Sequence, residues 1–169
     1  VLGGETGKSK IDETAVYSVK KFMSSAEIRN IRVILPEDIV AIDGELNNYS
    51  SSFIISGGRV PEDMRVVDIG PAAQADFAKR LAKAKTILWA GPLGVCENSE
   101  FKKGTEFLAK TLAETDTFNV IIGQDTIEAA LESNEKGMRS FISQGGETAL
   151  NYIIGNRLPA IAAMEERIK

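Results

Sequence analysis

Short apolar runs alternate along this chain with segments of helical periodicity, and this alternation limits the folds that are open to it. The apolar runs cover residues 31–35, 66–68, 86–89, 118–122 and 140–142. Between them, apolar side chains recur every three or four residues, in residues 12–26 and around Phe77, Leu108, Ile127 and Ala149. We therefore predict a doubly wound, three-layer α/β/α fold of Rossmann-like type, with a mainly parallel sheet of about five or six strands between helices.

One stretch, residues 43–61, breaks this alternation. It carries Asn47, Asn48, three successive serines and a Gly57–Gly58 pair, all of which favour turns, but it also contains the apolar run 53–55. We predict an irregular or hairpin-like excursion here and not a linker, and we treat residues 1–169 as a single domain.

Composition restricts the partners of this chain. Its 169 residues are 43% hydrophobic and 26% charged, which is typical of a folded globular domain. Twenty Lys and Arg stand against 24 Asp and Glu, a formal charge of -4, and no long basic run offsets it. The chain has no run of about 18 apolar residues and no signal-peptide pattern. We expect a soluble, cytoplasmic protein with no nucleic-acid or membrane partner.

The sequence contains no histidine and a single cysteine, Cys96. These counts exclude Ser-His-Asp and Cys-His catalysis, zinc sites with histidine ligands, and an internal disulfide. Any chemistry must therefore use carboxylates, lysines and backbone amides.

Four glycine-containing turns follow apolar runs, at residues 3–4, 90–94, 123–126 and 144–147. In a parallel sheet, ligands bind beyond the carboxyl ends of the strands, and free amides at helix N-termini favour phosphate. Each turn taken alone is typical of a tight strand-to-helix connection, whereas four along one edge make a site for a phosphorylated ligand an equal alternative. None is a Walker A loop, because Leu2 stands where that motif needs its first glycine.

Two charged side chains near these turns have both a structural and a functional interpretation, whereas two further side chains are expected to be structural. Asp125 could be a first-turn charge of a helix or a Mg²⁺ ligand beside nucleotide phosphates. Glu97 could be a solvated loop charge or an acceptor for ribose hydroxyls. We expect Trp89 to belong to the core and Cys96 to be a half-buried filler.

The segment TILWAGPLGVCE, residues 86–97, resembles the W-N-G-P and G-V-F-E motif of the phosphoglycerate kinase family. Further segments resemble other motifs of that family in the same order: residues 33–38 (LPVD), 67–71 (LDIGP), 121–126 (IIGGGDT), 143–147 (STGGGAS) and 158–159 (LPG). The resemblance covers essentially the whole chain and points to the C-terminal, nucleotide-binding half of such a kinase. It implies that the N-terminal domain, which holds phosphoglycerate, is absent from this chain.

The resemblance also implies nucleotide contacts. Glu97 matches the glutamate that holds the ribose, and Pro92 and Leu93 match residues of the nucleoside pocket. If residues 1–4 match the IIGG strand end, Gly3 and Gly4 lie beside the adenine. If they match the GGAKVSDK strand end instead, Thr6 stands where the first lysine belongs. In both alignments the lysine that contacts phosphate has no assigned counterpart.

The remaining matched positions concern the phosphates and the metal. Asp125 and Thr126 match the pair that contacts Mg²⁺ and phosphate, so Asp125 is the expected metal ligand. Gly145 and Gly146 match amides that face the transferring phosphoryl group. The expected catalytic residues are Gly123, Gly145 and Gly146, and the expected nucleotide-binding residues are Gly3, Gly4, Pro92, Leu93, Glu97, Gly123, Gln124, Asp125 and Thr126.

Three departures from the family motifs fall at the same turns. Ala90 replaces the Asn of W-N-G-P, Gln124 stands in a shortened glycine tract, and Glu147 replaces a third glycine. A carboxylate at Glu147 opposes the field of the amides there, so we expect weakened nucleotide binding.

The function implied by the resemblance is that of a glycolytic phosphotransferase. The full enzyme would move a phosphoryl group between 1,3-bisphosphoglycerate and ADP with Mg²⁺, as a monomer, and this chain alone would be inactive. Such catalysis depends on positioning and charge neutralisation and needs no histidine. Two alternatives stay open: a kinase-like domain that has lost catalysis and acts as a binding or structural module, and an unrelated domain that binds another phosphorylated metabolite.

Overall fold

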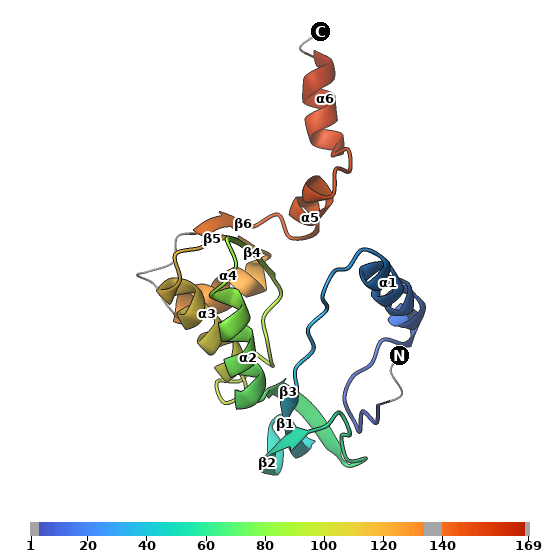
Figure 1. Ribbon diagram of the computed structural model, residues 1–169, viewed down its shortest axis with the longest axis vertical. Helices are drawn as coiled ribbons and strands as arrows, with labels where there is room; N and C mark the ends of the chain where they lie inside the picture. Colours follow the sequence, from blue (N-terminus) through green and yellow to red (C-terminus); the bar gives the residue numbers. More distant parts are fainter. Residues whose placement is uncertain (1–3, 134–139, 168–169) are drawn as a thin grey trace.

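The computed structural model describes residues 4–133 and 140–167 of the chain (Figure 1). The elements, in chain order, are the 3₁₀ helix η1 (Glu13–Ala15), α1 (Val16–Ile28), β1 (Asp38–Glu45), β2 (Asn48–Ser56), β3 (Met64–Ile69), α2 (Pro71–Leu81), β4 (Thr86–Ala90), α3 (Lys103–Glu114), β5 (Phe118–Ile122), α4 (Gln124–Ser133), β6 (Ser140–Ser143), α5 (Glu147–Ile153) and α6 (Pro159–Arg167).

The predicted parallel sheet is formed by three strands in the order β4-β5-β6. One face of this sheet carries Ile87, Trp89 and Ile121, and these side chains pack in one buried cluster with apolar residues of α3 and α4. Trp89 is only 5% exposed, which confirms its expected place in the core. Alternation along β4 buries every second residue, as a sheet face covered by helices requires. The α/β class and a parallel sheet flanked by helices are therefore confirmed.

The excursion predicted at residues 43–61 is a β-hairpin. β1 pairs with β2 on one side and with β3 on the other, both antiparallel, so these strands form a second three-stranded sheet in the order β2-β1-β3. Ile42, Val67 and Phe101 form its buried cluster. The second sheet lies next to α2 and below the parallel sheet in Figure 1.

Two strand predictions need correction. Residues 31–35 form no strand, and Ile31 and Leu35 are each 56% exposed. An apolar run becomes a strand only where a neighbour pairs with its backbone groups, and none of the described strands pairs with this one. Residues 66–68 do form part of a strand, β3, but β3 joins the hairpin and not the parallel sheet. Among the described residues the parallel sheet therefore has three strands and not five or six.

Two helices begin at residues whose chemistry favours a helix start. Asp12 accepts a hydrogen bond from the Thr14 amide at 2.9 Å and so caps η1, which leads directly into α1. Pro71 is the first residue of α2, a position where the missing N–H of proline costs nothing.

A buried carboxylate joins the β2-β1-β3 sheet, which we call the hairpin sheet, to α2. Asp38, at the start of β1, is 4% exposed and accepts hydrogen bonds from the amides of Ala72 and Ala73 at 3.0 and 2.7 Å. Gly70, the local N-cap residue of α2, has no side chain for this task. Asp38 thus satisfies the free amides of α2 from a distant part of the sequence.

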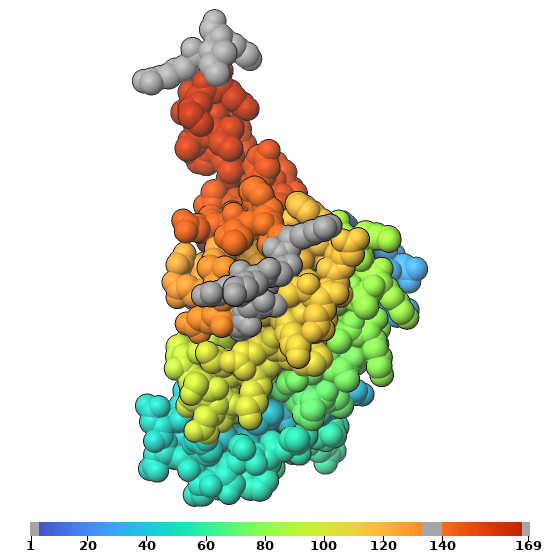
Figure 2. Space-filling model, turned by 90° about the vertical axis from the view of Figure 1, so that its left-hand side faces the viewer, coloured from blue at the N-terminus to red at the C-terminus, as the bar shows by residue number. Residues whose placement is uncertain are grey.

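The last two helices leave the body of the molecule. α5 follows β6, and α6 projects beyond it as an arm that the space-filling view shows clearly (Figure 2). Within residues 4–133 and 140–167, no helix is both long and apolar enough to span a membrane.

Candidate functional site

Three of the four predicted glycine turns lie at one edge of the parallel sheet. They follow the carboxyl ends of β4, β5 and β6, and the backbone links two of them, since the Gly123 amide donates to the Ser143 carbonyl at 3.1 Å. Gly91, Gly94, Gly123 and Gly146 have φ values of +99°, +72°, +93° and +49°. Side chains with a Cβ rarely adopt such values, so these turns require glycine.

The fourth turn lies beside the other sheet, so the expectation that all four turns share one edge is wrong for Gly4, while its contact with a nucleotide stays a prediction. The segment from Gly4 to Lys8 is tied to the loop before β3: the Val60 amide donates to the Glu5 carbonyl at 2.9 Å, and the Lys8 amide donates to the Met64 carbonyl at 2.7 Å. A Cβ on Gly4 would lie 3.0 Å from the Gly58 carbonyl oxygen. These bonds hold Gly4 beside the hairpin sheet, away from the other turns. Gly3 lies outside the described residues.

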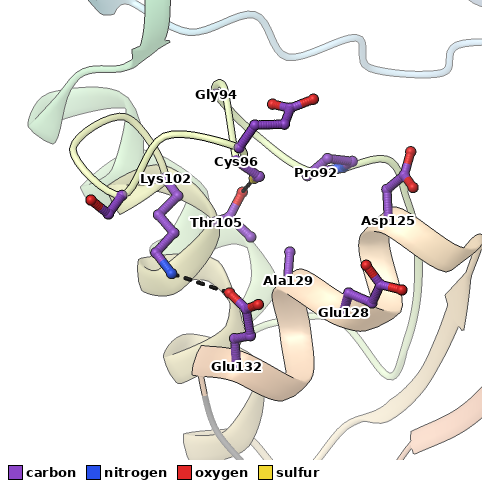
Figure 3. A pocket seen from close by; sticks show the side chains of 11 residues that line it. Pro92, Gly94, Cys96, Lys102, Thr105, Asp125, Glu128, Ala129 and Glu132 are labelled. Atoms are coloured by element: carbon purple, nitrogen blue, oxygen red, sulfur yellow. Dashed lines mark hydrogen bonds and ion pairs between the residues drawn. The ribbon is translucent and has the colours of Figure 1, made fainter. Parts of the chain in front are cut away.

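A cavity of about 520 Å³ opens between the β4–α3 loop, the start of α3 and one face of α4 (Figure 3). It brings together three residues predicted for the nucleotide site, Pro92, Glu97 and Asp125. The remaining lining residues are Gly94, Cys96, Ser99, Lys102, Thr105, Glu128, Ala129 and Glu132.

Two predicted nucleotide contacts have a different place in the structure. The Thr126 hydroxyl is buried and accepts a hydrogen bond from the Gly91 amide at 2.8 Å, so Thr126 joins the turn after β4 to α4. Leu93 lines a separate, mostly apolar pocket with Phe77 and Trp89. The contacts of Thr126 and Leu93 with a nucleotide stay predictions.

The floor of the cavity is built around Thr105. Its hydroxyl oxygen accepts a hydrogen bond from the Leu93 amide at 2.8 Å and lies 3.2 Å from the Cys96 sulfur. Burial raises the pKa of the Cys96 thiol, so the sulfur is mostly protonated near neutral pH. Cys96 is half-buried, which agrees with its predicted role as a filler.

Charge in the cavity is predominantly negative. Asp125, Glu128 and Glu132 follow one another along the same face of α4 (Figure 3), and Glu97 is a further carboxylate among the lining residues. One lysine, Lys102, is among the lining residues; its ammonium lies 3.2 Å from Glu132. The hydrogen bond to Glu132 raises the pKa of Lys102, so the lysine is charged and paired.

Three of the charged lining residues, Glu128, Glu132 and Lys102, were not among the residues predicted for the site. The i, i+3, i+7 spacing of Asp125, Glu128 and Glu132 is the signal that places all three on one helical face. For Lys102 the signal is weaker, because a lysine just before a helix is usually solvated.

Carboxylate ligands alone form no metal site here. Among the described residues, no group of three or more Asp, Glu or Cys side chains is arranged to hold a metal ion. Mg²⁺ commonly takes only one or two protein carboxylates together with the phosphates of its nucleotide, and Asp125 is available for that purpose.

The turn after β6 leads directly into α5. Gly145 and Gly146 precede α5, and their carbonyls accept hydrogen bonds from the amides of Thr148 and Leu150. Glu147 is exposed in the first turn of α5, the position from which we expected it to oppose phosphate. The catalytic role of Gly123, Gly145 and Gly146 stays a prediction.

A second buried carboxylate lies directly behind the cavity. Asp68, at the end of β3, accepts hydrogen bonds from the amides of Ile69 and Gly104, each at 2.8 Å. Burial, more than any nearby charge, raises the pKa of Asp68. Gly104 belongs to the first turn of α3, so Asp68 caps α3 as Asp38 caps α2.

Comparisons with known proteins agree with the resemblance seen in the motifs. The family model described as phosphoglycerate kinase matches residues 1–156. Phosphoglycerate kinase of Helicobacter pylori is 36% identical over 166 residues, which are 98% of this chain and 41% of that protein. The enzyme of Pelotomaculum thermopropionicum is 32% identical over 165 residues, again 98% of this chain and 42% of the relative.

Solved structures give the same result. Phosphoglycerate kinase from Coxiella burnetii superposes with a TM-score of 0.86 at 30% identity, over 98% of this chain and 42% of that one. The enzyme from Pyrococcus horikoshii shares the fold, with a TM-score of 0.67 at 24% identity. This chain therefore spans about two fifths of the length of the relatives it matches. With its motifs, its fold and almost all of its length matched, it belongs to the phosphoglycerate kinase family.

Proposed function

We propose that this chain is the nucleotide-binding part of a phosphoglycerate kinase, which as a whole protein transfers a phosphoryl group between 1,3-bisphosphoglycerate and ADP. The observation that carries the proposal is the cavity of about 520 Å³ at the carboxyl edge of the parallel sheet, lined by Pro92, Glu97 and Asp125. Its volume lies within the range of roughly 300–1,000 Å³ that is usual for small-molecule sites. Its place, beside the N-terminus of α4, is where such sheets bind phosphorylated ligands.

Each lining residue has a task that its position allows. Glu97, on the loop, accepts hydrogen bonds from ribose hydroxyls, and Pro92 contacts the nucleoside. Asp125, in the first turn of α4, faces the phosphates together with the free amides of that turn. Bound Mg²⁺ supplies neutralisation of phosphate charge, and Asp125 is the residue of this chain that would hold it.

The acidic lining makes Mg²⁺ more important to this site. Glu97, Asp125, Glu128 and Glu132 repel an unshielded polyphosphate, while Lys102 is already paired with Glu132. We therefore expect Mg·ADP to bind more tightly than free ADP, and both to bind weakly. Phosphoglycerate binding, and with it turnover, would depend on the part of the family's length that this chain does not span. Loss of the aligned acceptor forfeits about 7–11 kcal/mol of barrier reduction, so we expect no turnover by this chain alone.

Calorimetric titration of the chain with Mg·ADP tests the proposal. Asp125→Asn should weaken Mg·ADP binding by roughly tenfold or more, because one metal-facing carboxylate is lost. Glu114→Gln, an exposed carboxylate at the far end of α3, is the matched control and should leave the affinity unchanged.

Absence of any binding heat at millimolar Mg·ADP, with no rise in melting temperature, would refute nucleotide binding. That result would favour the alternative of a kinase-like domain that serves as a binding or structural module. Turnover by the chain alone in a coupled assay would contradict the expected dependence on the rest of the protein.

A further inference from the structure

Asp68 is a buried side chain that the proposed nucleotide site leaves without a role. It is 5% exposed, it comes from the hairpin sheet, and none of its atoms lines the cavity of Figure 3. Its Oδ2 accepts the hydrogen bond of the Gly104 amide at the start of α3. Lys102, the local N-cap residue of α3, makes no side-chain capping bond, so Asp68 performs this task from a different sheet.

The loop between β4 and α3 and the first turn of α3 both pack against the Asp68 carboxylate. A Cβ added to Gly94, on the loop, would lie 2.6 Å from Asp68 Oδ1, and one added to Gly104, on α3, would lie 2.4 Å from the same oxygen. Contacts of this length leave no room for a methyl group. The loop is held again one residue later, because the Val95 amide donates to the Val67 carbonyl at 2.9 Å.

From Gly104 the contacts continue into the cavity. Thr105, its neighbour in α3, bonds to the Leu93 amide and touches the Cys96 sulfur. Glu97 follows Cys96 directly and lines the cavity. The position of Glu97 therefore depends on where the first turn of α3 lies, and that turn is fixed by Asp68.

Asp38 provides an internal comparison. It is buried to the same extent as Asp68 and also accepts two backbone amides, but the helix it caps is α2. Neither Ala72 nor Ala73 lines the cavity. A purely structural role predicts equal consequences for the two aspartates, whereas a role in the site predicts different ones.

We propose that Asp68 is a positioning residue of the nucleotide site, which holds the first turn of α3 and the loop of Gly94 so that Glu97 faces the ligand. It contacts no ligand itself and acts through Gly104 and Thr105. The expected effect on nucleotide binding rests on the proposed function, whereas the expected effect on the loop does not.

The first experiment compares Asp68→Asn with Asp38→Asn at a temperature where both variants are fully folded by circular dichroism. Asp68→Asn should weaken Mg·ADP binding by roughly tenfold, as loss of a supporting hydrogen bond behind a site commonly does. Asp38→Asn should bind within about twofold of the unmodified chain, because α2 does not form the cavity. Equal losses of affinity in the two variants, or none in Asp68→Asn, would overturn the proposal.

The second experiment needs no nucleotide. Cys96 is the single cysteine of the chain, so its reaction with a disulfide reagent such as dithiobis(nitrobenzoate) reports on the cavity floor alone. Asp68→Asn should react at least about threefold faster, because the loop opens more often, and Asp38→Asn should react at the unmodified rate. An unchanged rate in Asp68→Asn would overturn the proposal even where nucleotide binds. Faster labelling without nucleotide binding in any variant would retain the positioning role and refute only the proposed function.

A third variant covers the case in which Asp68→Asn does not fold. Thr105→Val keeps the Asp68–Gly104 bond and removes the next contact, between the Thr105 hydroxyl and Leu93. It should show both faster Cys96 labelling and weaker Mg·ADP binding. If Thr105→Val shows neither effect, the contacts of Thr105 do not fix the position of the loop that carries Glu97, and the proposal fails.

Discussion

Gly104→Ala should destabilise the protein, although alanine is ordinarily the better residue in a helix. Gly104 lies in the first turn of α3 and is buried against two side chains of the hairpin sheet. An added Cβ would lie 2.4 Å from Asp68 Oδ1 and 2.7 Å from Ile69 Cγ1. Both obstacles are themselves buried, so neither can swing into solvent to make room.

The magnitude follows from three opposing contributions. Alanine in place of glycine gains about 1 kcal/mol of helix propensity. Overpacking of a filled site costs about 1–3 kcal/mol. If the methyl group pushes Asp68 away, the Gly104 amide loses its acceptor, which costs about 1–3 kcal/mol more. Because the contact with Oδ1 is too short to keep, we expect both costs to apply, and the net expectation is a loss of about 1–5 kcal/mol in the free energy of unfolding.

Urea unfolding followed by the fluorescence of Trp89, the single tryptophan, measures this change. The matched test repeats the substitution in an Asp68→Ala background, where the nearest obstacle is gone. There Gly104→Ala should cost clearly less, so that the two substitutions are not additive. A Gly104→Ala variant as stable as the unmodified chain would refute the packing of α3 against Asp68.

Two further predictions concern titration. Burial raises the pKa of Asp68 above its ordinary value of 3.8, so the folded state holds this proton more tightly than the unfolded chain does. The stability that this proton contributes is fully present below pH 3.8 and is lost as pH rises through the folded pKa of Asp68. Urea unfolding at a series of pH values from 4 upward should therefore show a falling free energy of unfolding, measured relative to Asp68→Asn. The hydrogen bond from the Tyr49 phenol to Glu100 raises the pKa of Tyr49 above 10.0. An alkaline absorbance titration, taken as the difference between the unmodified chain and Tyr49→Phe, should have its midpoint above pH 10.0, and a midpoint at or below that value would contradict the Tyr49–Glu100 contact.

The sequence predicts the three strands β4, β5 and β6 of the parallel sheet because their signals are local. Each of β4, β5 and β6 is a short apolar run followed by a glycine turn, and Pro71 and Asp12 mark helix starts by their own chemistry. The prediction fails for residues 31–35, where the apolar run gives no information about a pairing partner. It also misses that β3 joins the hairpin, since an apolar run of this kind does not reveal the direction of its neighbours.

The candidate site, like the fold, could be predicted from the sequence only in part. Pro92, Glu97 and Asp125 could be predicted to meet, because the turns after neighbouring parallel strands share one edge of the sheet. Asp68 could not, because its partner Gly104 lies 36 residues away and nothing in either local sequence indicates the bond. The sequence places Thr126 in the turn after β5 but does not reveal its structural role. Only the structure shows that its hydroxyl accepts a hydrogen bond from the Gly91 amide.

The loop between β4 and α3 explains why the two sheets must act together at this site. It leaves the parallel sheet, carries Glu97 past the cavity, and is then fastened to the hairpin sheet, where Phe101 is buried beside Val67 and the Asn98 amide group donates to the Leu46 carbonyl at 3.4 Å. A loop held only at its β4 end would leave Glu97 free to sample many positions, and ordering it on binding would then cost conformational entropy. Because the hairpin sheet holds the other end of the loop, this conformational entropy is lost when the chain folds and not when the ligand binds. The hairpin therefore contributes to the site although none of its strand residues lines the cavity.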